Sequence, residues 1–206
     1  SGEPLDPGLV AKACQDEMRR FDHMQVYQHV PREEAHGKIV KVRWVHLNKG
    51  TPEELAIKCR LVAMEFASVE HRDDLFAETP PLFAIKILLS LVASSSSDSE
   101  CLMILDVKCA FLYGFIKRDL YVELPPEDPR HGEGVVGKLV KSMCGTRDAP
   151  QIWQETVGLK LASIGFTASA LHPAIYMHFD KEIRVVVHVY DFLCTGSRKH
   201  LKWLHD

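Results

Sequence analysis

At 206 residues, the chain is long enough for one sizeable hydrophobic core, or for one domain with a small subdomain. Its 46% hydrophobic and 26% charged content is that of an ordinary globular protein, and no apolar run reaches the ~18 residues of a membrane span. The 25 basic and 28 acidic side chains give a formal charge of −3. Any contact with nucleic acid must therefore come from a local patch and not from the overall field.

Six cysteines are scattered along the chain, at positions 14, 59, 101, 109, 144 and 194. None forms a C-x-x-C motif, and none lies at zinc-ligand spacing to a pair of histidines, so the pattern favours reduced, mostly buried thiols over a zinc site. Reduced thiols, together with a polar start that is unlike a signal peptide, predict an intracellular compartment, cytoplasm or nucleus.

The first 35 residues are predicted to form a helix followed by an irregular strand. Four apolar side chains recur there near helical spacing: Val10, Cys14, Met18 and Phe21. Two alternating apolar runs follow at residues 39–45 and 57–63. The turn signal at residues 48–52 between these runs predicts an antiparallel pair of strands.

The middle of the chain contains a predicted loop, a helix and a second loop. Residues 67–81 are polar and end in two prolines, which predicts an extended loop. Residues 82–93 are apolar nearly throughout, as in a buried helix. The serine-rich patch at residues 94–100 is short enough to be a loop and not a domain linker.

Strands and helices alternate irregularly in the second half. Strands are expected at residues 101–106, 121–124 and 136–140, a helix at 153–164, and a final hairpin of strands at 174–179 and 183–189. This order favours an α+β fold with a central antiparallel sheet over a doubly wound parallel one.

Two apolar, strand-like runs each deliver an aspartate at their end, Asp106 and Asp191. Phosphoryl transfer needs metal ions held against the phosphates and the attacking oxygen more than it needs covalent help from the protein. Magnesium is usually bound by one or two protein carboxylates. The two aspartates are therefore candidate ligands for Mg²⁺ or Mn²⁺, although a single aspartate after a strand is in most proteins a turn residue.

Several motifs occur in one order along the chain, and each resembles a motif of the reverse transcriptases of copia-type (Ty1-like) LTR retrotransposons. Residues 58–63 (KCRLVA) resemble K-A-R-L-V-A, and residues 105–114 (LDVKCAFLYG) resemble L-D-V-K-T-A-F-L-N-G. Residues 145–153 (GTRDAPQIW) resemble the variant G-T-R-D-A-x-x-x-W. Further matches fall at residues 42–45, 76–81, 121–126, 138–145, 164–166 and 172–176.

The resemblance implies the fingers and palm of a right-hand polymerase, which extends a DNA primer with dNTPs on an RNA or DNA template. It implies an N-terminal entry to the fingers at residues 1–35, a fingers-like subdomain at 36–100 and a palm at 101–206, with the thumb absent after Asp206. The chain would then be a fragment of a larger polyprotein.

The resemblance also implies roles for individual side chains. Asp106 matches the first metal-binding aspartate. Phe111 matches the aromatic steric gate beneath the deoxyribose, with an ordinary core phenylalanine as the alternative. Lys58 and Arg60 match cations of the fingers strand that faces the triphosphate, with a solvated strand face as the alternative. Gly145 matches the segment that passes under template and nucleotide, where glycine permits close backbone approach.

The last hairpin departs from the family pattern of two consecutive aspartates. Tyr190 stands at the first, metal-bridging position, and Asp191 matches the second. A phenol is neutral until about pH 10 and bulkier than a carboxylate, which makes it a poor magnesium ligand. Strand alternation is expected to turn Asp191 to the opposite face, where it cannot substitute. We therefore predict a polymerase fold with severely impaired or absent activity.

Two other function classes remain open. The first is a non-catalytic nucleic-acid-binding or interaction module derived from such a polymerase, which magnesium-dependent nucleotide incorporation would distinguish from an enzyme. The second is a cysteine hydrolase. Its candidate pair, His188 and Cys194, would lie about 20 Å apart along a strand and has no oxyanion motif beside it.

Overall fold

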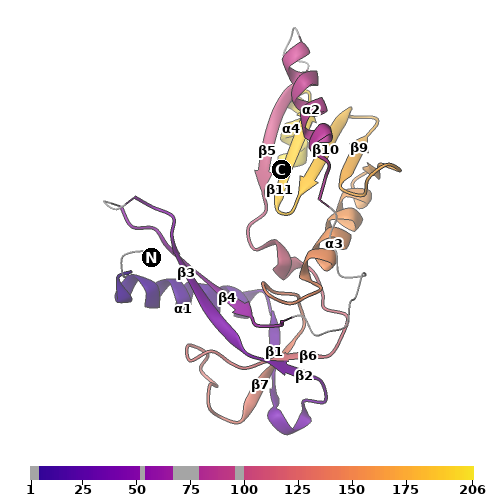
Figure 1. Cartoon of the computed structure of the whole chain (residues 1–206). Coiled ribbons are helices and arrows are strands. Elements are labelled where there is room, and N and C mark those ends of the chain that lie inside the picture. Colours follow the sequence, from indigo (N-terminus) through magenta and orange to yellow (C-terminus); the bar gives the residue numbers. More distant parts are fainter. Residues whose placement is uncertain (1–4, 52–53, 67–78, 96–99) are drawn as a thin grey trace. The chain divides into compact units, whose positions relative to one another are not determined.

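The computed structural model describes residues 5–51, 54–66, 79–95 and 100–206. These residues contain four α-helices and eleven β-strands in three sheets, so the fold is mixed α and β, as predicted. The chain forms two compact units, each built from two segments. Unit 1 comprises residues 1–73 and 111–152, and unit 2 comprises residues 74–110 and 153–206. Figure 1 shows the elements of both units.

Unit 1 begins with helix α1 (Pro7–His23), which confirms the predicted N-terminal helix. The Asp6 carboxylate caps the helix by accepting a hydrogen bond of 2.8 Å from the Leu9 N–H, and Pro7 at the first position has no N–H to satisfy. Three buried side chains recur at a spacing of three and four residues: Cys14, Glu17 and Phe21. This face of α1 packs against the sheet that contains β4.

Strands β3 (Val42–Asn48) and β4 (Ile57–Ala63) form a two-stranded antiparallel sheet, which confirms the predicted pair. The first strand is displaced from its expected range, because residues 38–40 form a separate strand, β2 (Lys38–Val40). Strand β2 pairs in parallel with β6 (Leu120–Val122) in a different sheet. An uninterrupted run of alternating apolar residues gives no sign that its two halves pair with strands of different sheets.

The second sheet of unit 1 has the strand order β1–β7–β6–β2. Its other members are β1 (Tyr27–Pro31) and β7 (Val135–Leu139), and the short 3₁₀ helix η1 (Arg32–Glu34) follows β1. The 3₁₀ helix η3 (Ala110–Tyr113) leads into this part of the chain. The core around the sheet includes four fully buried side chains: Val26, Leu120, Val122 and Val136.

Unit 2 contains a five-stranded antiparallel sheet in the order β5–β11–β10–β9–β8. The strands are β5 (Cys101–Asp106), β8 (Thr167–Ala168), β9 (Ile175–His178), β10 (Ile183–His188) and β11 (Asp191–Gly196). Strands β5, β9 and β10 confirm the predictions. Strand β11 is not among the predicted strands.

Three helices complete the described structure: α2 (Leu82–Ser94), α3 (Ala149–Ser163) and α4 (Arg198–His205). The expectation that residues 82–93 form a buried helix is only half right. Ala84 and Leu88 pack against Val186 of the sheet, whereas several large apolar side chains of α2 are exposed: Leu82, Phe83, Ile87, Leu89 and Leu91. An apolar sequence does not show which side of a helix meets the sheet.

Parts of the predicted turn and loops lie outside the described residues, namely residues 52, 67–78 and 96–99, as do residues 1–4 at the start. Residues 79–81 are described and belong to neither helix nor strand. Where the structure is described, no helix is both long enough and apolar enough to cross a membrane.

Candidate active site

Two aspartates lie directly opposite each other at the ends of neighbouring strands in unit 2. Asp106 is the last residue of β5 and Asp191 the first of β11, and the two are register partners in this antiparallel pair. The strands lie side by side in Figure 1. Directly paired residues project from the same face, with Cβ atoms about 4.5–5.5 Å apart. Both aspartates are exposed, so the structure brings two carboxylates together at one solvent-facing position.

The expectation that strand alternation turns Asp191 away is wrong. Val189 and Tyr190 form a two-residue turn between β10 and β11, and His188 pairs with Asp191 across it. Alternation stops at the turn, so β11 begins with Asp191 on the face of Asp106. The metal-binding role of the two aspartates remains a prediction.

Two hydrogen bonds within unit 2 hold the turn that carries Tyr190. The Val107 N–H donates to the Tyr190 carbonyl oxygen over 3.1 Å, and the indole Nε1–H of Trp153 donates to the Val189 carbonyl oxygen over 2.5 Å. Trp153 also packs edge-on against Phe192, with ring centroids 6.5 Å apart. The family motif places a tryptophan at 153, but sequence reasoning did not assign it to this turn.

Val189 adopts a φ of +55°, in the left-handed region that is unfavourable for a β-branched residue. The first central position of a two-residue hairpin turn commonly has positive φ and favours glycine or asparagine. The backbone of the turn therefore keeps a conformation that its valine does not favour.

Lys58 and Arg60 lie together on the exposed face of β4 in unit 1. Cys59 between them is buried, as strand alternation requires, and the cross-strand neighbours of the two cations are Leu47 and Val45. This exposed arrangement of cations is expected both for a strand that binds phosphate and for an ordinary solvent-facing strand. The role of Lys58 and Arg60 therefore stays a prediction.

Phe111 lies half-buried in η3, where its carbonyl oxygen accepts a hydrogen bond of 2.5 Å from the buried Ser142 hydroxyl. This contact fixes the backbone at Phe111 and leaves the role of the ring as a prediction.

Gly145 lies where the backbone following Met143 meets the end of β4. Its φ is +87°, and a Cβ atom at this position would come within 2.0 Å of the Ala63 carbonyl oxygen. The Ala63 N–H donates to the Cys144 carbonyl oxygen over 2.8 Å. The close backbone approach expected at this glycine therefore has an internal cause, the contact with β4.

Arg118 joins two carboxylates in unit 1 and has no counterpart among the predicted site residues. Its guanidinium donates to Glu65 over 2.8 and 2.6 Å and to Asp148 over 2.7 and 3.0 Å. The side chains of Glu65 and Asp148 are 3% and 10% exposed. Asp148 belongs to the G-T-R-D-A motif, but nothing in the sequence pairs it with residues 30 and 83 positions away.

The electrostatics of this cluster favour the ionised acid. Burial by itself would raise the pKa of Glu65, but hydrogen bonds from Arg118 and from the Arg147 N–H, which lies 3.0 Å away, bring that pKa below its usual value. The bonds to Asp148 and Glu65 raise the pKa of Arg118 in turn. The cluster ties residues 147 and 148 to the chain just beyond β4.

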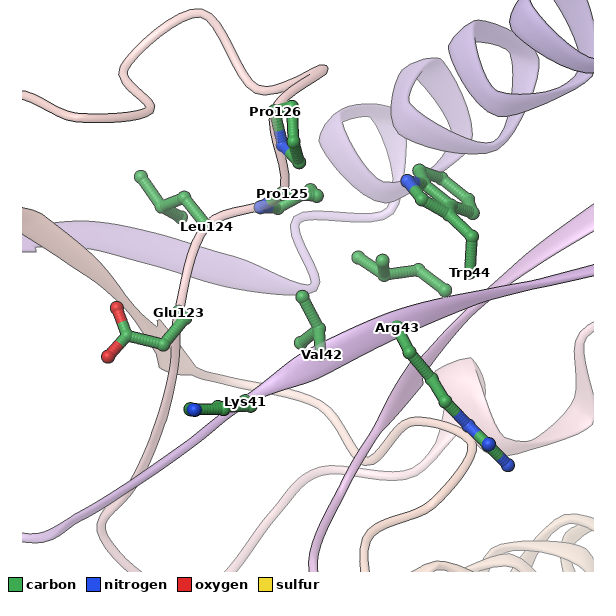
Figure 2. Close-up of a pocket in the computed structure, with 9 residues that line it drawn as sticks. Lys41, Val42, Arg43, Trp44, Glu123, Leu124, Pro125 and Pro126 are labelled. Carbon is green, nitrogen blue, oxygen red and sulfur yellow. The ribbon is translucent and has the colours of Figure 1, made fainter.

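Unit 1 also contains a pocket of about 270 Å³ beside β3, shown in Figure 2. Val42 and Leu124 provide apolar walls, while the Arg43 side chain points away on the other side of the strand. Glu123 at the pocket is paired with Arg32 through two hydrogen bonds of 2.8 and 2.7 Å. None of the predicted site residues lines the pocket.

Residues 24–205 match the reverse transcriptase (RNA-dependent DNA polymerase) family, and the chain belongs to that family. It is 31% identical over 199 residues to the retrovirus-related Pol polyprotein from transposon TNT 1-94 of Nicotiana tabacum, which covers 92% of this chain and 15% of that protein. It is 29% identical over 177 residues to the corresponding polyprotein from transposon RE1 of Arabidopsis thaliana, covering 82% of this chain and 12% of the relative.

A third relative, the polyprotein from transposon RE2 of Arabidopsis thaliana, is 28% identical over 168 residues and covers 77% of this chain and 11% of the relative. These matches confirm the predicted copia-type reverse transcriptase domain. The chain spans less than a sixth of the length of each of these relatives.

Proposed function

We propose that this chain is the polymerase part of a copia-like Pol polyprotein, with activity impaired by Tyr190. The reaction would add dNTPs to a DNA primer on an RNA template by two-metal phosphoryl transfer. The observation that carries the proposal is the direct opposition of Asp106 and Asp191 in a chain that belongs to the reverse transcriptase family.

The donor atoms suit the metal that such a reaction uses. Two exposed carboxylates offer hard oxygen ligands of the kind that Mg²⁺ and Mn²⁺ prefer. A bound ion would supply charge neutralisation at the phosphates and a more acidic primer hydroxyl. Asp106 and Asp191 would together hold one ion. A second ion would lack the bridging carboxylate at position 190, because the phenol of Tyr190 is neutral at physiological pH.

We also propose that unit 2, which holds the aspartates, serves as the palm, and that unit 1 serves as the fingers. In this assignment the two subdomains, expected at residues 101–206 and 36–100, are each built from two segments of the chain. Lys58 and Arg60 would neutralise the triphosphate, Phe111 would exclude a ribose 2′-hydroxyl, and Gly145 would lie near the template.

Primer extension on a homopolymer RNA template tests the proposal, with Mg²⁺ and Mn²⁺ assayed separately. We expect Tyr190→Asp to raise the rate of incorporation by on the order of 100-fold or more, because it restores a bridging carboxylate. Tyr190→Phe is the matched control, since it removes the hydroxyl without adding charge, and it should stay at the level of the unaltered chain. Adding Asp106→Asn to Tyr190→Asp should abolish the gain.

An unaltered chain that extends primers as fast as Tyr190→Asp would show that two aspartates suffice and that the proposed impairment is wrong. The alternative function, a non-catalytic nucleic-acid-binding module, is favoured by the same tyrosine. It would be supported if neither protein extends a primer while both bind primer–template with an affinity that falls steeply with salt.

A further inference from the structure

Two cysteines and a histidine meet in unit 1 between α1 and the β3–β4 sheet. Cys14 comes from α1, while His46 of β3 and Cys59 of β4 are cross-strand partners. The three ligand atoms all lie within 4.8 Å of one another, and Cys14 Sγ is 3.8 Å from His46 Nε2. Among the residues that the structure describes, this is the one such group of three or more metal-ligating side chains.

The spacing of these atoms is close to that of a tetrahedral zinc site. Zn–S bonds of about 2.3 Å and Zn–N bonds of about 2.0 Å place tetrahedral ligand atoms roughly 3.5–3.8 Å apart. The Cys14–His46 separation of 3.8 Å lies at the upper end of this range, and the other two separations, which are at most 4.8 Å, need only a small side-chain adjustment. Two thiolates and an imidazole select zinc over magnesium, which prefers oxygen ligands.

The cluster is buried on one side and open to solvent on the other. Cys14 and Cys59 are 2% and 6% exposed, whereas His46 is exposed and leaves a side open to solvent. A zinc ion that reached the cluster from this open side would bind by displacing the thiol protons.

We propose that Cys14, His46 and Cys59 bind one zinc ion, with a water molecule in the fourth position. Such an ion would hold α1 against the β3–β4 sheet and so stabilise unit 1. The expectation of plain buried thiols rested on spacing in the sequence. The ligands are 32 and 13 residues apart on three elements, so only the fold shows the cluster.

The test is a zinc titration of the full chain in reducing buffer with excess magnesium, which occupies carboxylate sites. Zinc retained after gel filtration is measured, and cobalt replaces zinc in a parallel sample to report thiolate ligands through its charge-transfer absorption. We expect one zinc per chain and a zinc-dependent rise in melting temperature. Cys14→Ser and Cys59→Ser should lose both, while the control Cys101→Ser in unit 2 should keep them.

His46→Gln guards against a folding artefact, because His46 is exposed and its replacement leaves the buried thiols in place. It should keep the circular dichroism spectrum of the unaltered chain but bind zinc more weakly, with a weakened tetrahedral cobalt signature. The proposal is overturned if the His46, Cys14 and Cys59 variants take up as much zinc as the unaltered chain. It is equally overturned if the reduced chain takes up none.

Discussion

Arg118 shows how much of unit 1 depends on one side chain. Its guanidinium makes hydrogen bonds to both Glu65 and Asp148, whose carboxylates are almost entirely buried. Removing Arg118 would leave Glu65 with the more distant Lys38, whose Nζ lies 3.8 Å from its carboxylate oxygen. A buried carboxylate with incomplete charge compensation costs more than the intact pair contributes. The effect of removing Arg118 should therefore be far larger than that of removing a cation from a surface pair.

Arg118→Met is expected to lower the free energy of unfolding by about 2–3 kcal/mol, less than the roughly 3–5 kcal/mol for breaking a fully buried pair, because the arginine itself is 30% exposed. Arg130→Met is the matched control. It removes an exposed pair with Glu133, three residues away, and should change stability by about 0.5 kcal/mol or less. Urea denaturation followed by circular dichroism measures both, and equal losses in the two variants would contradict the argument.

At the scale of elements, the backbone around Gly145 joins the end of β4 to the segment that leads into α3. The contact requires both a left-handed φ and the absence of a side chain, since the Ala63 carbonyl oxygen occupies the space of a Cβ atom. A side chain at position 145 would therefore push two backbone segments apart. The overlap cannot be relieved by moving a flexible side chain, because the atom it meets belongs to the backbone.

Gly145→Ala is expected to destabilise the protein by about 3 kcal/mol or more, the sum of backbone strain and steric overlap. Gly132→Ala separates the two causes. Gly132 has a similar φ of +81° with nothing within 4 Å of its Cβ position, so its variant should lose only about 1 kcal/mol. Thermal and urea denaturation provide the comparison, and losses of the same size would show that overlap at Gly145 is absent.

Sequence patterns predicted these elements better than they predicted their partners. Periodicity located α1, α2, β4, β5 and the β9–β10 hairpin. It did not separate β2 from β3, because both halves of that run are apolar and alternate. It also overstated the burial of α2, whose Phe83 and Ile87 are exposed. Which strands pair, and which face of a helix is buried, depends on segments far away in the sequence. Local periodicity carries no information about those segments.

The candidate site was predicted unevenly for the same reason. The motifs identified Asp106 and Asp191 as candidates, and the structure places them opposite each other. Alternation failed as a guide at Tyr190 because a turn interrupts the strand there. Arg118 and the Cys14–His46–Cys59 group carried no signal, since their partners lie far apart in the sequence.

At the scale of the molecule, unit 1 is held together by polar contacts between distant segments. Asp128 accepts a hydrogen bond of 2.6 Å from the hydroxyl of Tyr27 and lies 3.0 Å from His29 Nε2, about a hundred positions earlier in the chain. Glu123 pairs with Arg32 across 91 positions. Hydrogen bonds lower the pKa of both acids, as they lower that of Glu65, although burial opposes the shift. The ionised carboxylates make these contacts stronger than protonated acids would.

Acid should therefore weaken unit 1. A carboxyl group whose pKa is lowered by folding stabilises the protein above its unfolded pKa, here 4.5 for Glu65, and this contribution is lost as the pH falls through the folded value. Glu65→Gln should lower the free energy of unfolding by about 1–3 kcal/mol at pH 7. The difference from the unaltered chain should shrink steadily below about pH 4.5.

Urea denaturation at a series of pH values measures this difference, and Glu133→Gln, at an exposed position, is the control that should stay close to the unaltered chain throughout. A Glu65→Gln difference that is the same at pH 7 and pH 3 would contradict the assigned role of the ionised carboxylate. Both proteins contain Glu17, whose pKa is raised by burial, so that its contribution to stability has the opposite pH dependence. Because this contribution is the same in both proteins, it cancels in the difference between their free energies of unfolding.

The direct pairing of Asp106 with Asp191 forms the candidate metal site, and it also brings two like charges together. Like charges directly across a strand pair repel each other, so these two carboxylates destabilise the end of the sheet whenever no cation lies between them. A third carboxylate at position 190 would add to this repulsion, whereas an uncharged phenol does not. In the proposed function Tyr190 weakens catalysis, and the same residue avoids a third negative charge beside Asp106 and Asp191. Catalysis and stability then place opposite demands on this turn.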